Sequence, residues 1–174
     1  MTASYSQKIM LLAVSASFLS GCASMNNRQD PLEKMNRAVF SFNEKFDEYV
    51  FEPTARGYRT VVPDPIEMII GNFFSNIGDV AVTANSLLQL KFADAAASSS
   101  RILINTTFGF LGAIDLASHI SQVSDIDISK RNEDFGQTLG FYGIGSGPYL
   151  VLPILGPSTV RDTVGIGVDS TIFH

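Results

Sequence analysis

The sequence predicts a mainly α-helical domain that also contains one irregular segment rich in glycine and proline. Three observations lead to this fold class: apolar residues recur at helical spacing, helix-start patterns precede two of these segments, and glycine and proline concentrate in residues 140–162. Of the 174 residues, 45% are hydrophobic and 17% are charged. Because no internal apolar run reaches the roughly 20 residues of a spanning helix, we expect a compact multi-helix domain that associates with a membrane.

Residues 1–21 have the pattern of an export signal. A lysine supplies a positive charge near the start, residues 9–19 form a short apolar run, and two small residues follow. Cys22, the single cysteine of the chain, comes next. Residues 22–29 are then expected to form a polar tether ahead of the main domain.

Leu19, Ser20, Gly21 and Cys22 resemble the bacterial lipobox, in which leucine and two small residues precede a cysteine. The resemblance implies transfer of a diacylglyceryl group to the Cys22 thiol, cleavage after Gly21 and acylation of the new amino terminus. Several acyl chains make a stable anchor, since each buried CH₂ contributes about 0.8 kcal/mol. By resemblance to Gram-negative lipoproteins, Ala23 favours sorting to the outer membrane. A cysteine buried in an apolar helix is the alternative interpretation.

The first helix of the main domain is predicted to start at residue 30. Asp30 suits an N-cap, Pro31 suits the first helical position, and Glu33 completes an arrangement like a capping box. Apolar residues then follow at spacings of three and four: Leu32, Met35, Val39, Phe42, Phe46 and Tyr49. We interpret this stripe as core-facing for the most part, although its aromatic content also fits a helix that contacts acyl chains.

The same start pattern recurs at Asp64, Pro65 and Glu67, and it predicts a second helix that continues to about residue 90. Residues 52–63, between these two helices, are expected to be a connector with at most a short helical turn. Four further helices are predicted over residues 94–108, 113–120, 133–139 and 158–168. Residues 140–162 cannot form a simple helix, because glycine permits positive φ angles and three prolines interrupt the segment.

The sequence argues against several function classes. A nucleic-acid footprint needs clustered Lys and Arg, whereas the 12 basic residues here are scattered along a chain of net charge −5. Two histidines and one cysteine do not supply the usual zinc ligands. The glycine-rich stretch 143–147 lacks the spacing of both a nucleophile elbow and a dinucleotide-binding loop. We therefore expect no catalytic residue, no metal and no cofactor.

Residues 30–43, 103–117 and 133–162 resemble the MlaA/VacJ phospholipid-transport lipoproteins. The third segment is the most specific, with the order G-x-Y-G-x-G-x-G-P-Y followed by L-P, G-P and R-D. The resemblance implies a mostly helical ring near the inner leaflet of the outer membrane of a Gram-negative bacterium. It also implies an amphipathic central channel, a trimeric porin as partner, and transfer of mislocalised outer-leaflet phospholipids to a periplasmic phospholipid-binding carrier.

Eight residues from the first helix and the glycine-rich segment are candidates for the channel lining: Asn36, Phe42, Asn43, Phe46, Tyr142, Gly143, Gly145 and Tyr149. Two other functions remain open, namely an adaptor lipoprotein that binds a porin or another envelope partner without moving lipid and, more remotely, an envelope lipid hydrolase. The resembled family continues beyond the point where this sequence stops. We therefore expect residues 30–174 to be an incomplete domain that is less stable than a full-length member.

Overall fold

The computed structural model describes residues 30–171, so the predicted signal, the tether and Cys22 lie outside the described residues. The elements are α2 (Glu33–Phe46), the π-helix η1 (Asp47–Phe51), α3 (Glu52–Val61), α4 (Asp64–Leu88), α5 (Phe92–Thr107), α6 (Leu116–Val123), α7 (Phe135–Phe141), β1 (Tyr149–Leu152), β2 (Gly156–Thr159) and α8 (Val160–Thr171). This inventory confirms the mainly α-helical fold class.

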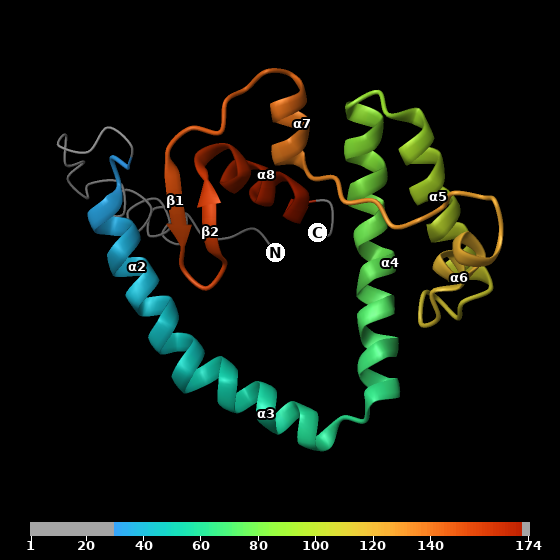
Figure 1. Cartoon of the computed structure of the whole chain (residues 1–174), viewed down its shortest axis with the longest axis horizontal. Coiled ribbons are helices and arrows are strands. Elements are labelled where there is room, and N and C mark those ends of the chain that lie inside the picture. Colours follow the sequence, from blue (N-terminus) through green and yellow to red (C-terminus); the bar gives the residue numbers. More distant parts are fainter. Residues whose placement is uncertain (1–29, 172–174) are drawn as a thin grey trace, which may run out of the picture.

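The elements follow one another around an open ring (Figure 1). In that view α2 and α3 form one curved side and α4 forms the opposite side, with α5 packed on the outer side of α4 and α6 packed on α5. The two-stranded sheet, α7 and α8 lie between the start of α2 and the end of α4. The ring therefore depends on contacts between the first helix and a hairpin more than 100 residues later in the chain.

Residues 52–61 are helical, so the prediction of a connector there is wrong. One long bent helix runs from α2 through η1 into α3, and it ends at Val61, before the extended backbone of Val62. Pro53 cannot donate a backbone hydrogen bond, and a wider π-turn just before it accommodates this loss. Phe46 and Phe51 pack edge to face across the π-turn, with ring centroids 5.0 Å apart.

The predicted aspartate caps of the first two long helices are only partly present. The Asp30 carboxylate accepts a hydrogen bond from the Leu32 backbone N–H at 3.1 Å, but α2 begins at Glu33 without a side-chain cap. Asp64 is itself the first residue of α4, which follows the extended Pro63 and also lacks a side-chain cap. The helices form where expected because their spacing and prolines favour them, whereas the residues that precede them take different backbone angles.

The later helices agree with the prediction within a few residues. The largest difference is at α6, which starts three residues later than expected, because residues 108–115 form turns with positive φ at Phe110, Leu111 and Gly112. The Asp115 side chain then caps α6 by accepting the Ser118 backbone N–H. α7 has the equivalent cap, made by Asp134 and the Gln137 N–H. In both caps the aspartate side chain accepts the N–H of the residue three positions later, which is the usual N-cap geometry.

The glycine-rich segment is not a simple helix, as predicted, and it forms an antiparallel hairpin that the sequence analysis did not foresee. Tyr149 pairs with Thr159, and Leu152 pairs with Gly156. Among the glycines nearby, Gly165 of α8 is required by close packing, since an added Cβ would lie 2.5 Å from the backbone nitrogen of Gly136 in α7. Glycine at this crossing lets α7 and α8 approach each other closely.

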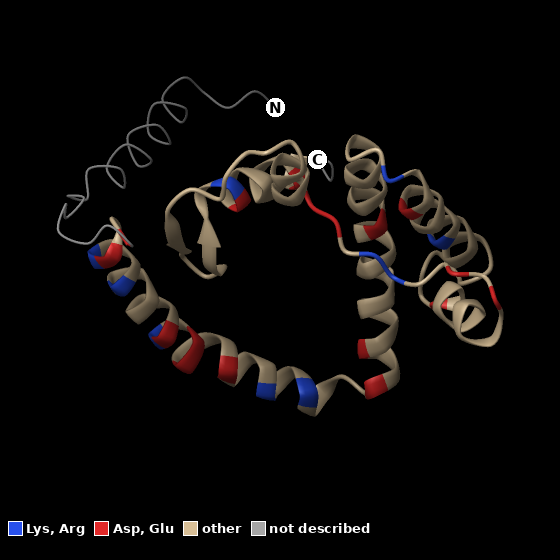
Figure 2. Ribbon diagram, turned by 45° about the horizontal axis from the view of Figure 1, so that its top comes forward, with Lys and Arg blue, Asp and Glu red and all other residues tan. Residues whose placement is uncertain are grey.

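The burial pattern is inverted relative to a typical soluble domain. The buried apolar residues of the described chain are mostly small: Ala81, Val82, Ala95, Ala97, Ala117, Ile128 and Val151. Large apolar side chains are instead exposed on every helix, and the stripe predicted to face the core includes Phe42 of α2 at 50% and Tyr49 of η1 at 71% exposure. Most of α4 and the whole hairpin are free of charged residues, whereas both signs of charge occur along α2, η1 and α3 (Figure 2). Over residues 30–171, no helix combines the length and the apolar character that crossing a membrane requires.

Candidate functional site

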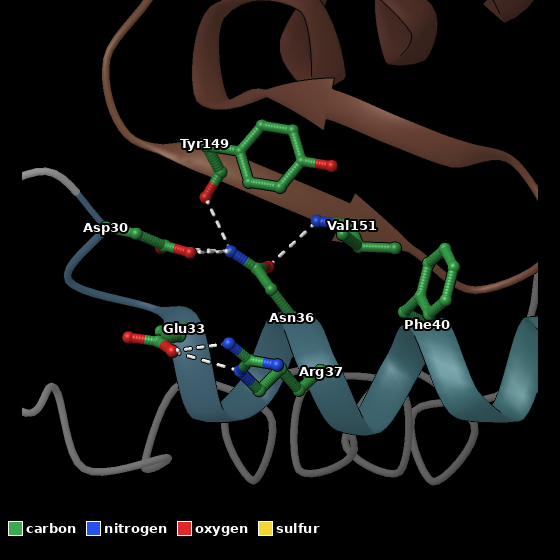
Figure 3. A pocket seen from close by; sticks show the side chains of 7 residues that line it. All are labelled: Asp30, Glu33, Asn36, Arg37, Phe40, Tyr149 and Val151. Carbon is green, nitrogen blue, oxygen red and sulfur yellow. Dashed lines mark hydrogen bonds and ion pairs between the residues drawn. The ribbon is translucent and has the colours of Figure 1, made fainter.

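Asn36 is the single buried residue of α2, and it joins that helix to strand β1 (Figure 3). Its Nδ2 donates to the Tyr149 carbonyl oxygen at 3.1 Å, and its Oδ1 accepts the Val151 N–H at 2.9 Å. The same Nδ2 also donates to an Asp30 carboxylate oxygen at 3.1 Å. Both polar atoms of the Asn36 amide are therefore satisfied, as its 4% exposure requires.

The Asn36 amide occupies the free edge of β1. The Val160 N–H donates to the Pro148 carbonyl, which shows that the even-numbered residues of this segment face β2. Successive residues of a strand point their backbone groups to opposite edges, so Tyr149 and Val151 face away from β2. The side-chain amide takes the place that a third strand would fill, and it protects an edge that is otherwise open to pairing.

Asn43 repeats the same contact two helical turns later. Its Nδ2 donates to the Leu152 carbonyl at 2.9 Å, and its Oδ1 accepts the Ile154 N–H at 2.8 Å. Leu152 is the last residue of β1 and Ile154 lies in the turn that follows, so Asn43 holds the turn of the hairpin while Asn36 covers the free edge of the strand. We name this pair, Asn36 and Asn43, the amide clamp.

Three pockets follow one another along α2, η1 and α3. The first, of about 320 Å³, is lined by Asp30, Glu33, Asn36, Arg37, Phe40, Tyr149 and Val151. The second, of about 200 Å³, is lined by Phe40, Asn43, Phe46, Asp47, Phe51, Val151, Ile154, Gly156 and Pro157. The third, of about 460 Å³, is lined by Asp47, Phe51, Thr54, Ala55, Tyr58, Arg59 and Glu67. Neighbouring pockets share two lining residues each, so together they form one track.

The track is amphipathic. Its first pocket has a charged rim, where Arg37 and Glu33 form an ion pair at 2.9 Å. Its middle pocket is mostly aromatic and aliphatic, and its last pocket has charged groups again at Arg59 and Glu67. Such an alternation can hold a molecule that has both a charged part and an apolar part.

The structure brings together four of the eight candidate channel residues. Asn36, Asn43, Phe46 and Tyr149 line the first two pockets of the track. Phe42 stacks on Phe46 at 5.8 Å and is half exposed, outside these pockets. The other three candidates, Tyr142, Gly143 and Gly145, lie in or next to the loop after α7, and the Tyr142 hydroxyl donates to the Leu88 carbonyl at 2.6 Å. The amides of Asn36 and Asn43 hold the hairpin, a role that the sequence analysis did not assign.

A second polar cluster, buried between α4, α5 and α6, was not predicted. The Arg101 guanidinium, 1% exposed, pairs with Asp79 at 3.1 Å and with Asp115 at 3.0 Å, and it also donates to the Ser118 hydroxyl and the Ile128 carbonyl. Lys130 is the second cation on Asp79, which is fully buried. The signal in the sequence was a lone arginine within an alanine- and serine-rich helix.

The Asp115 carboxylate is held ionised in this cluster. Burial acts to raise its pKa, but hydrogen bonds from Ser118, Asn105 and Arg101 outweigh that effect and lower the pKa to about 2. Cations and amides already occupy the carboxylates of this cluster. Among residues 30–171, no group of three or more His, Cys, Asp or Glu side chains could hold a metal ion. The cluster therefore has the character of a structural centre.

Comparisons with known proteins all point to one family of lipoproteins, and the matches cover nearly the whole described chain. A family model described as MlaA lipoprotein matches residues 28–174. The chain is 36% identical over 173 residues to a protein of Haemophilus influenzae named intermembrane phospholipid transport system lipoprotein MlaA, covering 95% of this chain and 68% of that protein. It is 36% identical over 163 residues to the Escherichia coli protein of the same name, covering 91% of this chain and 64% of that one.

Other similarities extend this result. An uncharacterised Rickettsia prowazekii protein is 42% identical over 133 residues, and the match covers 76% of this chain and 51% of that protein. The chain thus spans about half of the Rickettsia relative and about two thirds of the two MlaA proteins. A solved structure from work on the structural basis for maintenance of bacterial outer membrane lipid asymmetry matches with a TM-score of 0.72 and 36% identity, over 83% of this chain and 71% of that one.

Proposed function

Because the chain belongs to the MlaA lipoprotein family, we propose that it is an outer-membrane lipoprotein that removes mislocalised phospholipids from the outer leaflet. It passes them to a periplasmic phospholipid-binding carrier and so maintains the lipid asymmetry of the outer membrane. The names of its relatives support this proposal, since two of them are phospholipid transport lipoproteins.

The inverted burial pattern is the structural observation that supports the proposal independently of the family name. Large side chains such as Phe74, Phe108 and Phe110 are 64–80% exposed, while asparagine, serine and a charged cluster fill much of the interior. Exposed apolar surface on this scale marks contact with a membrane, a ligand or a partner. Exposing apolar surface to water costs about 25 cal/mol of free energy per Å². Contact with lipid acyl chains removes this cost.

The pocket track provides a path of the required chemistry. A phospholipid has a charged headgroup and apolar tails, and each tail methylene costs about 0.8 kcal/mol when it is transferred into water. Charged residues at Glu33, Arg37 and Arg59 fit the headgroup, and the aromatic middle pocket around Phe46 and Phe51 fits the tails. The chain acts as a passive amphipathic conduit in this proposal, and no step needs a catalytic group.

The anchor and the partners complete the proposed arrangement. Acylation at Cys22, after cleavage behind Gly21, tethers the domain to the inner leaflet so that it faces the periplasm. A trimeric porin holds it in the outer membrane, and the carrier of the same pathway receives the lipid. These parts rest on the lipobox and on the family resemblance.

Lipid analysis of the purified chain tests the proposal. The chain is extracted from membranes in a mild detergent, the detergent is exchanged, and the phospholipid that remains bound is measured by mass spectrometry. We expect at least one phospholipid per chain, with a marked loss in Phe46→Gln, which alters the track. The matched control Phe108→Gln changes an equally apolar side chain outside the three pockets, and it should retain the lipid.

Complementation separates transport from an adaptor role. In a strain that lacks its own phospholipid transport lipoprotein, we expect this chain to reduce the phospholipid exposed in the outer leaflet, and Phe46→Gln to fail at comparable abundance. A chain that purifies free of lipid but bound to a porin, and that leaves outer-leaflet phospholipid unchanged, would establish the adaptor function instead.

A further inference from the structure

The two ends of the pocket track differ in whether their charged side chains already have partners. In the first pocket, the Arg37 guanidinium pairs with Glu33 at 2.9 Å. The Asp30 carboxylate of the same pocket accepts a hydrogen bond from the Asn36 side chain at 3.1 Å. The charged groups at this end of the track therefore bind one another or a neighbouring amide of the protein.

The third pocket, at the other end, is lined by three charged side chains that have no such partner. Asp47 comes from η1, Arg59 from the last turn of α3, and Glu67 from the first turn of α4. All three residues are exposed, and within residues 30–171 none of their side chains makes a hydrogen bond or an ion pair. One cation and two anions thus line a single space of about 460 Å³, within the range of about 300–1,000 Å³ that is typical of ligand pockets.

Apolar side chains connect these charges to the middle of the track. Phe51 and Asp47 line both the second and the third pocket, so the aromatic middle pocket continues directly into the third one. Ala55 and Tyr58 add further apolar surface to the third pocket. A molecule whose charged end lies in the third pocket can therefore place its apolar part against Phe51 and in the second pocket.

We propose that the third pocket holds the lipid headgroup and that it selects zwitterionic phospholipids, whose headgroup carries an amine. The Arg59 guanidinium pairs with the phosphate, whose oxygen atoms match its fork of donors. Asp47 and Glu67 accept the ammonium group of an ethanolamine headgroup. A phospholipid with a glycerol headgroup offers these carboxylates no cation, and they oppose its net negative charge. This assignment rests on the proposed function, since it names the lipid class that the track carries.

Competition between two lipids tests the selectivity. The full chain in one detergent is offered equal amounts of phosphatidylethanolamine and phosphatidylglycerol with the same acyl chains, and the bound lipid is measured by mass spectrometry. We expect bound phosphatidylethanolamine to exceed phosphatidylglycerol about threefold, a ratio in the range that exposed charge pairs supply. Asp47→Asn combined with Glu67→Gln should bring this ratio close to one. The matched control Glu48→Gln, next to Asp47 but outside the pockets of the track, should leave the ratio unchanged.

Loss of the phosphate partner should act on both lipids alike. Arg59→Gln should lower the total bound phospholipid about fivefold without changing the ratio, because both lipids carry the phosphate. Arg56→Gln is the matched control, since Arg56 lies three residues earlier, outside the pocket, and pairs with Glu52. Circular dichroism should show the same helix content in every variant, because all the altered residues are exposed.

The outcomes separate this assignment from the proposed function. Equal binding of the two lipids, or an unchanged ratio in the double variant, overturns the selectivity while the proposed phospholipid transport stands. Total lipid that falls in Arg37→Gln but not in Arg59→Gln overturns the placement of the headgroup in the third pocket. Displacement of the bound lipid by water-soluble phosphoethanolamine overturns the lipid assignment in favour of a site for soluble phosphate esters. A chain that binds no phospholipid at all overturns the proposed function together with this assignment.

Discussion

Replacing Arg101 with methionine should destabilise the domain more than any other single change to its charged residues. Arg101 is 1% exposed, and its removal leaves the fully buried Asp79 with Lys130 as its sole cation. It also removes a donor from the buried Ile128 carbonyl. Breaking a buried ion pair by deleting one partner typically costs 3–5 kcal/mol. We place Arg101→Met at about 3 kcal/mol, the lower end of that range, because Lys130 remains and Asp115 can rehydrate.

The assay is denaturant unfolding of the full chain in a fixed detergent, followed by the helical circular dichroism signal. A loss of about 3 kcal/mol corresponds to a melting temperature lower by roughly 6–12 °C for a domain of this size. Arg131→Met is the matched control. Arg131 also pairs with two aspartates, Asp94 and Asp127, but these three side chains are 27–69% exposed. Exposed pairs contribute less than about 1 kcal/mol, so the control should change little.

Equal losses in Arg101→Met and Arg131→Met would refute the reasoning, since burial would then not govern the energy of the pair. A second change sharpens the test. Adding Asp79→Asn to Arg101→Met removes the buried charge that Lys130 alone would otherwise compensate, so the double variant should recover part of the lost free energy of unfolding. Additive losses in the double variant would show that the two side chains do not act as a pair.

Three further predictions concern pH, packing and the anchor. The folded-state pKa of Asp115 is lowered to about 2 from its usual 3.8, so its ionised form stabilises the fold above about pH 4, and this contribution fades as the pH falls towards 2. The free energy of unfolding of Asp115→Asn should therefore change less between pH 5 and pH 2 than that of wild type. Parallel acid profiles of the two proteins would contradict this. Gly165→Ala should cost about 1–3 kcal/mol, because the new methyl group meets the backbone of Gly136. The helical Gly71→Ala, which has open space, should instead stabilise by up to about 1 kcal/mol in the same denaturant assay. Cys22→Ala should lack the acyl groups in mass spectrometry and should shift towards the non-membrane fraction once residues 1–21 are removed. Unchanged fractionation of that cleaved chain would show that the helices hold the membrane without acyl chains.

The positions of the helices were largely predictable from local signals. Apolar spacing and the Asp-Pro start patterns located α2 and α4, and the ranges predicted for α5, α7 and α8 also agree with the structure within a few residues. The sequence failed at Glu52–Val61, where a proline and a glycine suggested a connector. There the π-turn η1 absorbs Pro53 and lets one bent helix continue. Whether a proline ends a helix depends on the geometry of the turn before it, and the local sequence pattern does not specify that geometry.

The candidate site was predictable only in part. Polar residues in an aromatic helix pointed to Asn36 and Asn43, and the glycine-rich segment pointed to Tyr149. Their actual contacts depend on strand β1, which lies more than 100 residues away in sequence. The buried Arg101 cluster escaped notice altogether, because its partners come from three separate segments.

The sequence by itself determined the helical class, the lipobox around Cys22 and the family resemblance, since these depend on short-range spacing and on motif order. Tertiary structure alone decided which surfaces are buried. A helix of mixed character, such as α2, can bury either face, and here it buries one asparagine and exposes Phe40 and Phe42. The reason is that β1 and the turn after it offer backbone groups that two amides seven residues apart can satisfy, and an unpaired buried amide would cost more than an exposed ring in apolar surroundings.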